Sequence, residues 1–242
     1  MALAGKPLKS TPKNRQKTAI TLTEALFIDT MQEDNRVALM ALHYLPSIGW
    51  FTNLMKYPAL RLEKCEHFVK STGRNRCEIG HAQGRQTLTI PIFGGRGQQV
   101  EMAKVKIAND RSWQRQHWHA LKTAYGKAPY FEDYAPYFKP FFEKKFDHLW
   151  DFNLALLQLC LKLLGLQVQL NFTLDFEKNL AEHTTDFRGQ KVLKIADQPL
   201  YYQGFSPQTG FLSDLSILDL LFQLGPQSRN YLQTCLKQVQ SA

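Results

Sequence analysis

A continuous apolar run, Val37–Ala41, most constrains what this chain can fold into. Five apolar residues in succession suit a buried strand. After a turn, apolar side chains recur at helical spacing at Trp50, Phe51, Leu54 and Met55. This strand–turn–helix unit predicts an α/β fold, and such folds bind ligands beyond the carboxyl ends of their strands. His43 and Tyr44 stand at that point of the chain.

The remaining patterns predict a mixed sheet with helices around it and a helical C-terminal part. Strands are expected at 60–65, 102–107 and 168–174, with a β-hairpin formed by 74–79 and 86–92. Helices are expected at 113–125, 150–164, 216–225 and 228–239. Pro136 and Pro140 interrupt the aromatic-rich segment 131–146, which is therefore expected to form short helices. Residues 175–210 are expected to be irregular, and a loop of this length is often functional.

Charge divides the chain into two parts. The net charge is +9, and five basic residues with no acid among them stand in the first 17 residues: Lys6, Lys9, Lys13, Arg15 and Lys17. Without them the balance falls to +9 − 5 = +4. We therefore predict a basic, disordered extension over residues 1–35, with Met31 as an alternative start, and a single domain over 36–242. A nucleic-acid-binding tail is the less favoured interpretation.

The cysteines and the hydropathy pattern argue for a reduced, cytoplasmic setting. The four cysteines form no CxxC pair and have no zinc-like histidine spacing behind them. No metal and no cofactor are predicted. No apolar stretch reaches the roughly 18 residues of a membrane span, and the first residues contain no apolar core of a signal peptide.

Several phrases, in order and spacing, resemble the WbqC-like protein family. They are HYLPSIGWF at 43–51, FVKSTGRNRC at 68–77, LTIPI at 88–92, Trp113 with His117-Trp118 and YGKAPYF at 125–131, and YQGF at 202–205 with FLSDLSILDLLF at 211–222. The resemblance runs from about Val37 to Leu232. The chain departs from the family at Gly73, where a bulky residue, often Tyr, is usual, and residues 1–35 have no counterpart.

The resemblance implies a cytoplasmic transferase of cell-surface polysaccharide (O-antigen type) biosynthesis. Aminoacyl (glycine) transfer to an amino sugar is the reaction suggested for such proteins, and the partner would be a small-molecule sugar or sugar nucleotide. The resemblance specifies no activated donor and no catalytic residue. A non-catalytic nucleotide-sugar or glycan-binding protein is the alternative, and a nucleic-acid-binding protein that uses the basic tail is a third possibility.

Basic residues near the start of the predicted hairpin form a candidate anion site. Arg74 and Arg76 are two residues apart, so on a regular strand they point to the same face. Two guanidiniums on one face suit a bidentate grip on phosphate or carboxylate, with Lys70 and Asn75 beside them. The alternative is a solvated strand edge guarded by basic residues.

His117 and His43 are the candidate catalytic residues. His117 belongs to the family-like helix and could serve as general base for an incoming amine. His43 stands at the end of the first strand. A structural histidine is the alternative for each. Cys77 follows Arg76, so a lowered thiol pKa and a covalent intermediate are a further possibility.

Three further polar side chains, Tyr44, Tyr125 and Gln203, complete the candidate binding site as hydrogen-bonding groups for a sugar, with ordinary core packing as the alternative. Asp219 lies in a very apolar helix, where a charge needs a partner or a position near the N-terminus. One explanation is a first-turn position, with Asp214 or Ser216 as cap. The other is a salt bridge to Arg74 or Arg76.

Overall fold

The computed structural model describes residues 1, 35–94, 99–189 and 198–241. Residue contacts divide the chain into two units, Met1–Asp34 and Asn35–Ala242. The predictions for the basic extension, including the nucleic-acid-binding tail and the alternative start at Met31, concern residues 2–34 and lie outside the described residues.

Four parallel strands form the main sheet, in the order β5-β2-β1-β6. They are β1 (Val37–Ala41), β2 (Ala59–Glu63), β5 (Gln169–Phe172) and β6 (Thr184–Asp186). The apolar run β1 is a central strand, paired on one side with β2 and on the other with β6. Its position between two neighbours explains why it carries no polar residue.

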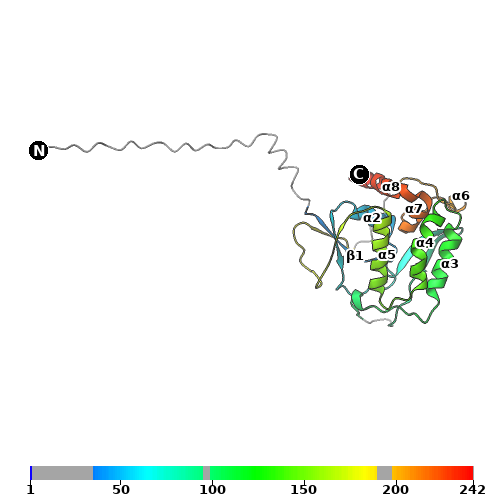
Figure 1. Ribbon diagram of the computed structural model, residues 1–242, viewed down its shortest axis with the longest axis horizontal. Helices are drawn as coiled ribbons and strands as arrows, with labels where there is room; N and C mark the ends of the chain where they lie inside the picture. The colour runs from blue at the N-terminus through cyan, green and yellow to red at the C-terminus, as the bar shows by residue number, and fades with distance from the viewer. Residues whose placement is uncertain (2–34, 95–98, 190–197, 242) are drawn as a thin grey trace. The chain divides into compact units, whose positions relative to one another are not determined.

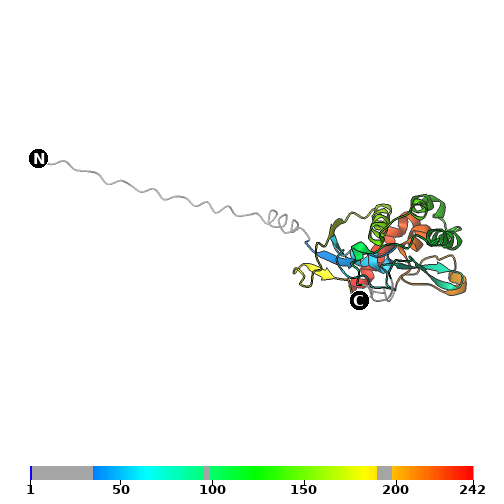
Figure 2. The same cartoon turned by 90° about the horizontal axis from the view of Figure 1, so that it is seen from below.

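An antiparallel hairpin forms a separate sheet. It consists of β3 (Arg76–His81) and β4 (Gly84–Thr89), and Gly84 supplies the positive φ of 106° where the turn closes. The hairpin lies away from the parallel sheet and contacts α3 (Trp113–Tyr125) (Figure 2). The predicted α/β fold is confirmed. Its parallel strands form the main sheet, and its antiparallel strands form the hairpin.

The helices contribute most of the aromatic core. They are α2 (Ile48–Leu54), α3, α4 (Phe131–Glu143), α5 (Leu149–Leu163), α6 (Ser206–Thr209), α7 (Ile217–Leu224) and α8 (Ser228–Ser241). Figure 1 shows α3 and α4 side by side, with α7 next to them. Phe222 of α7 joins them, because its ring packs against Tyr125 and Phe131 at centroid distances of 5.2 and 5.1 Å. The predicted helical C-terminal part is therefore confirmed.

Three local predictions were wrong. Residues 102–107 do not form a strand: Met102–Lys104 is a 3-10 helix, and the next residues make only isolated bridges to different segments, Ile92↔Ile107 and Lys106↔His148. Segment 131–146 contains one continuous helix, α4, because Pro136 and Pro140 both lie on its exposed face. There the carbonyls that the prolines leave without a donor can bind water. The segment 175–210 contains the strand β6.

None of the helices in the described ranges combines the length and apolar character needed to cross a bilayer.

Candidate functional site

A cavity of about 1440 Å³ lies at the carboxyl ends of all four parallel strands. Each strand leads directly into its wall: His43 follows β1, Glu66 follows β2, Leu174 follows β5 and Arg188 follows β6. Loops at this edge of a parallel sheet converge, which is why open α/β sheets bind ligands there. The cavity lies beyond the carboxyl end of β1, where the sequence predicted a binding site.

An ion network fixes the wall behind β2 and β6. Arg188 donates from Nη1 to Glu63 Oε2 at 2.6 Å and from Nη2 to Asp186 Oδ2 at 2.8 Å. Glu63 is fully buried, and its other oxygen accepts from the Thr173 hydroxyl at 2.7 Å. A buried carboxylate with a cation and a hydroxyl as partners is satisfied. The network therefore joins the ends of three strands into one rigid surface.

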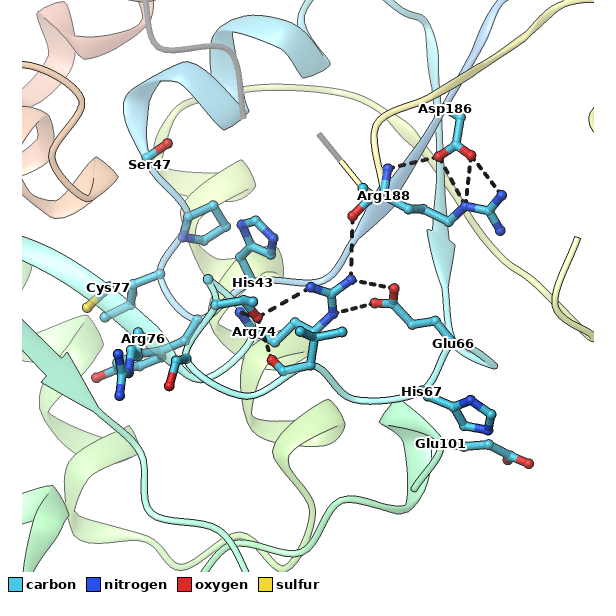
Figure 3. A pocket seen from close by; sticks show the side chains of 18 of the residues that line it. His43, Ser47, Glu66, His67, Arg74, Arg76, Cys77, Glu101, Asp186 and Arg188 are labelled. Carbon is cyan, nitrogen blue, oxygen red and sulfur yellow. Dashed lines mark hydrogen bonds and ion pairs between the residues drawn. The ribbon is translucent and has the colours of Figure 1, made fainter. Parts of the chain in front are cut away.

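Arg74 lines the cavity, and its guanidinium is held by Glu66. Its Nε donates to Glu66 Oε1 at 2.7 Å, its Nη2 contacts Glu66 Oε2, and both side chains are buried (Figure 3). Burial raises the pKa of Glu66, and the contact with Arg74 opposes that rise. The joint grip of Arg74 and Arg76 on an anion stays a prediction, and the structure shows that the Arg74 guanidinium already binds a carboxylate.

Arg76 keeps its binding capacity. It lines the cavity, its buried Nε has no hydrogen-bond partner, and it makes no ion pair with any described residue. Figure 3 shows its side chain beside Cys77, away from the Arg74–Glu66 pair. A guanidinium in this state is suited to a phosphate or carboxylate group of a ligand.

The other two members of the predicted anion site stand apart from it. Lys70 is exposed and is not among the residues that line the cavity. Asn75 is buried, and its Nδ2 donates to the Ile90 carbonyl at 3.0 Å. Asn75 therefore joins the two ends of the hairpin, and its Oδ1 has no partner among the described residues.

His43 lies in the cavity wall, half-buried, and makes no hydrogen bond within the described ranges. Burial, assisted by the positive charge of Arg74, lowers the pKa of His43 to about 3. The imidazole is therefore neutral at physiological pH. Its ring lies over Gly73, where an added Cβ would come within 2.5 Å of Nδ1. The glycine that departs from the family pattern is therefore required by the position of His43.

His117 and Tyr44 pair with each other in the core. The Tyr44 hydroxyl and His117 Nδ1 are 2.9 Å apart, and both side chains are buried. Trp113 packs edge-on against the imidazole at 5.2 Å. Burial lowers the pKa of His117 to about 4. His117 is not among the cavity-lining residues, whereas Tyr44 lines the cavity with its hydroxyl paired to His117.

Cys77 lines the cavity but is not activated. Burial, with a smaller effect of Glu78, raises the pKa of its thiol, so the expectation of a lowered pKa is wrong. Within the described residues, no group of three or more His, Cys, Asp or Glu side chains is arranged to hold a metal ion.

Asp219, Tyr125 and Gln203 form a second cluster. Asp219 Oδ2 accepts from the Tyr201 hydroxyl at 2.5 Å and lies 3.4 Å from Gln203 Nε2, while the Tyr125 hydroxyl accepts from the Gly80 amide at 3.3 Å. The three predicted residues line a space of only about 10 Å³ and none of them lines the large cavity. The proposed salt bridge of Asp219 to an arginine is wrong.

Asp219 lies in the first turn of α7, as the simpler explanation expected. Ser216 is the N-cap, and its hydroxyl accepts from the Leu218 amide at 3.4 Å. The carboxylate is therefore stabilised by hydrogen bonds and by the helix N-terminus rather than by a cation.

Backbone strain gathers at the cavity in a way that the sequence pattern did not reveal. The non-glycine residues with positive φ in the described ranges are Leu45 at 42°, Ser71 at 64° and Asp214 at 51°. All three line the cavity. Left-handed backbone is costly for such side chains and persists mainly at ligand-binding and active sites. This coincidence supports a functional role for the cavity.

Asp214 joins two helix N-termini at the cavity wall. Its Oδ1 accepts from the Gly49 amide at 2.7 Å, in the first turn of α2. Nearby, the Ile217 amide of α7 donates to the Pro46 carbonyl at 2.9 Å. Burial raises the pKa of Asp214 to about 6. Sequence reasoning considered Asp214 only as a cap of α7, and the Ser-Asp-Leu-Ser phrase gave no sign that it accepts from the Gly49 amide of α2.

Comparison with known proteins identifies relatives of the chain but no function. The sequence profile of the WbqC-like protein family matches residues 42–198, which is more than half of the chain. "Uncharacterized protein Rv1507c" of Mycobacterium tuberculosis (strain ATCC 25618 / H37Rv) is 25% identical over 228 residues, which cover 83% of this chain and 98% of that protein. No solved structure matches the chain.

Proposed function

Because the chain belongs to the WbqC-like protein family, we propose that its cavity binds a nucleotide-activated sugar and that the protein is a transferase of cell-surface polysaccharide (O-antigen type) biosynthesis. The observation that carries the proposal is that Arg76, which makes no ion pair with any described residue, lines a cavity whose wall also holds the three left-handed residues. This combination indicates a prearranged polar binding site.

The size of the cavity supports an extended ligand. At about 1440 Å³ it exceeds the roughly 300–1,000 Å³ that is common for pockets of drug-sized molecules. A sugar nucleotide combines a diphosphate, which suits the Arg76 guanidinium, with hydroxyl groups that suit the polar walls. A cytoplasmic location fits such a ligand and is part of the proposal.

Aminoacyl transfer to an amino sugar is the reaction that we favour. The amine nitrogen would attack the acyl carbon of an activated glycine, a C–N bond would form, and the bond from the acyl carbon to its leaving group would break. The amine proton must pass to a base. Asp214 is a stronger candidate for that base than His43, because burial raises the pKa of Asp214 to about 6 and lowers that of His43 to about 3.

A non-catalytic sugar-nucleotide-binding protein is the second candidate, and one observation favours it. His43, which follows β1 into the cavity wall, has a pKa of about 3, which makes it a weak proton acceptor. If Asp214 serves only to accept from the Gly49 amide of α2, neither Asp214 nor His43 is available as the base.

A thermal-shift panel tests the proposal across ligand classes. The panel contains UDP- and dTDP-amino sugars, ATP, coenzyme A thioesters and single amino acids. At about 100 times its Kd, a true ligand should add about 2.7 kcal/mol to the free energy of unfolding. We expect a shift with the sugar nucleotides that Arg76→Ala abolishes. Lys70→Ala is the matched control, because it removes the same charge outside the cavity. A panel without any shift would refute the proposal.

A product assay separates the two candidates. The protein is incubated with the sugar nucleotide that gives a shift and with glycine in activated form, and the mixture is analysed by mass spectrometry. A glycyl amide of the amino sugar that Asp214→Asn suppresses would support the transferase. Binding without any product would support the binding protein.

A further inference from the structure

Large apolar side chains are exposed at the mouth of the cavity. Leu174 is 92% exposed, Val69 is 50% exposed and Phe176 is 48% exposed, and all three line the cavity. Apolar groups of this size that surround a polar site commonly contact a ligand.

The segment that carries Leu174 and Phe176 is firmly attached to the sheet. The Thr173 amide donates to the Leu62 carbonyl at 3.1 Å, which extends the pairing of β5 with β2. Further along, Glu177 forms an ion pair with Arg61 at 3.0 Å. The apolar side chains are thus held in place on both sides, and their exposure does not follow from a lack of contacts.

Phe176 lines the cavity, and about half of the residue is exposed. The Arg188 guanidinium lies over its ring, 4.6 Å from the centroid. Arg188 is itself fixed by Glu63 and Asp186, and its Nη2 donates to the Glu177 carbonyl at 2.8 Å. One face of the ring is therefore covered by a fixed cation, while nearly half of the side chain is accessible. This arrangement makes a flat, rigid platform for stacking.

Lys178 adds a positive charge beside this platform. It follows Phe176 by two residues, lines the same cavity, and makes no ion pair with any described residue. An aromatic face next to an available cation is the combination with which proteins hold a base and its phosphates.

We infer that Phe176 stacks on the nucleobase of the sugar nucleotide, with Lys178 near its phosphates. This inference rests on the proposed function and specifies where the nucleoside part of the ligand lies. A planar ring fits the open face of Phe176 better than an isoprenoid chain does. Asp175 and Lys178 place charges within the same rim, which disfavours a lipid tail.

Calorimetric titration with two probes tests the inference. UDP carries base and diphosphate, whereas inorganic pyrophosphate carries the diphosphate alone. We expect Phe176→Ala to weaken UDP binding on the order of 10- to 100-fold, the range of stacking energies converted to affinity, and to leave pyrophosphate binding unchanged. Phe176→Trp should restore the affinity for UDP. Phe172→Ala is the matched control, because Phe172 is 42% exposed on the same segment but does not line the cavity.

Each possible result of these titrations supports or refutes the stacking role of Phe176. Unchanged UDP binding by Phe176→Ala overturns the stacking role and leaves the proposed function intact. An equal loss for UDP and pyrophosphate also overturns it, because the substitution would then act on the whole cavity. If the unmodified protein binds neither UDP nor any UDP- or dTDP-sugar, both the inference and the proposed function fail. A polyprenyl phosphate in detergent micelles whose binding depends on Phe176, without UDP binding, would assign the rim to a lipid carrier instead.

Discussion

Gly73 and His43 depend on each other, because the imidazole ring of His43 lies in the space that a side chain at position 73 would enter. A Cβ on Gly73 would lie 2.5 Å from Nδ1 and 2.8 Å from Cε1 of His43. The two segments are also joined by their backbones, since the Tyr44 amide donates to the Gly73 carbonyl at 2.8 Å. The histidine therefore cannot simply move away with its strand end.

Gly73→Ala should lower the free energy of unfolding by about 1–3 kcal/mol, the usual cost of overpacking. Adding His43→Ala should recover part of that loss, because the clash disappears. Urea denaturation of the two single variants and the double variant gives the coupling between the sites. Gly189→Ala serves as control, since an added Cβ there meets nothing within 4 Å. Strictly additive effects would show that His43 does not fill this space.

Glu66→Ala should destabilise the protein by about 3–5 kcal/mol, because it leaves the buried guanidinium of Arg74 without its carboxylate. Glu143→Ala removes one member of the exposed Lys139–Glu143 pair and should cause a far smaller loss. Chemical denaturation of the two variants measures the difference. Similar effects for both would mean that Arg74 reaches solvent when Glu66 is absent.

Asp214 should make the stability depend on pH. Its folded pKa of about 6 lies above its ordinary value of 3.8, so between these values the folded chain holds a proton that the unfolded chain has lost. The contribution of Asp214 to stability is therefore fully present below about pH 4 and is lost as the pH rises through 6. The free energy of unfolding of the unmodified protein minus that of Asp214→Asn should fall between pH 4.5 and 7.5, measured by urea denaturation. A constant or rising difference would contradict the assignment.

Tyr201→Phe should lower the free energy of unfolding by about 1.5–3 kcal/mol, because it removes the hydroxyl that donates to the buried Asp219 carboxylate. The neighbouring Tyr202 is 64% exposed, and no hydrogen bond of its hydroxyl is found among the described residues. Tyr202→Phe is therefore the control and should have almost no effect. Thermal or chemical unfolding of the two variants compares them directly.

Local sequence patterns predicted the elements that carry a clear apolar pattern or turn signal of their own. The apolar run β1, the helix α2 and the hairpin could all be recognised in this way. The strand β6 could not, because Thr-Thr-Asp has no apolar pattern and becomes a strand only by pairing with β1. The same limit applies to α4, where the tolerated prolines depend on which face meets solvent.

Position relative to the strands was enough to name some residues that line the cavity. The hydrogen-bond and ion-pair partners of the other candidate residues come from distant segments and could not be predicted. His43 and Arg76 line the cavity, as residues next to a strand can. The pairing of Arg74 with Glu66 was not predicted, because Glu66 stands on another segment, eight residues earlier. Asp219 is bound by Tyr201 and Gln203, which come from the irregular segment whose path no periodicity predicts. The strained backbone of Leu45 and Asp214 leaves no signal in residue type.

Calorimetric titration of a UDP-N-acetyl sugar into three proteins tests whether the cavity binds a sugar nucleotide through Arg76. The proteins are the unmodified chain, Arg76→Ala and the control Lys70→Ala. We expect saturable binding to the unmodified chain. Arg76→Ala should weaken it on the order of 10- to 100-fold, because a charge-assisted contact is lost, and Lys70→Ala should change it little. Equal binding by all three proteins would contradict it, because the ligand would then bind somewhere other than the cavity that Arg76 lines.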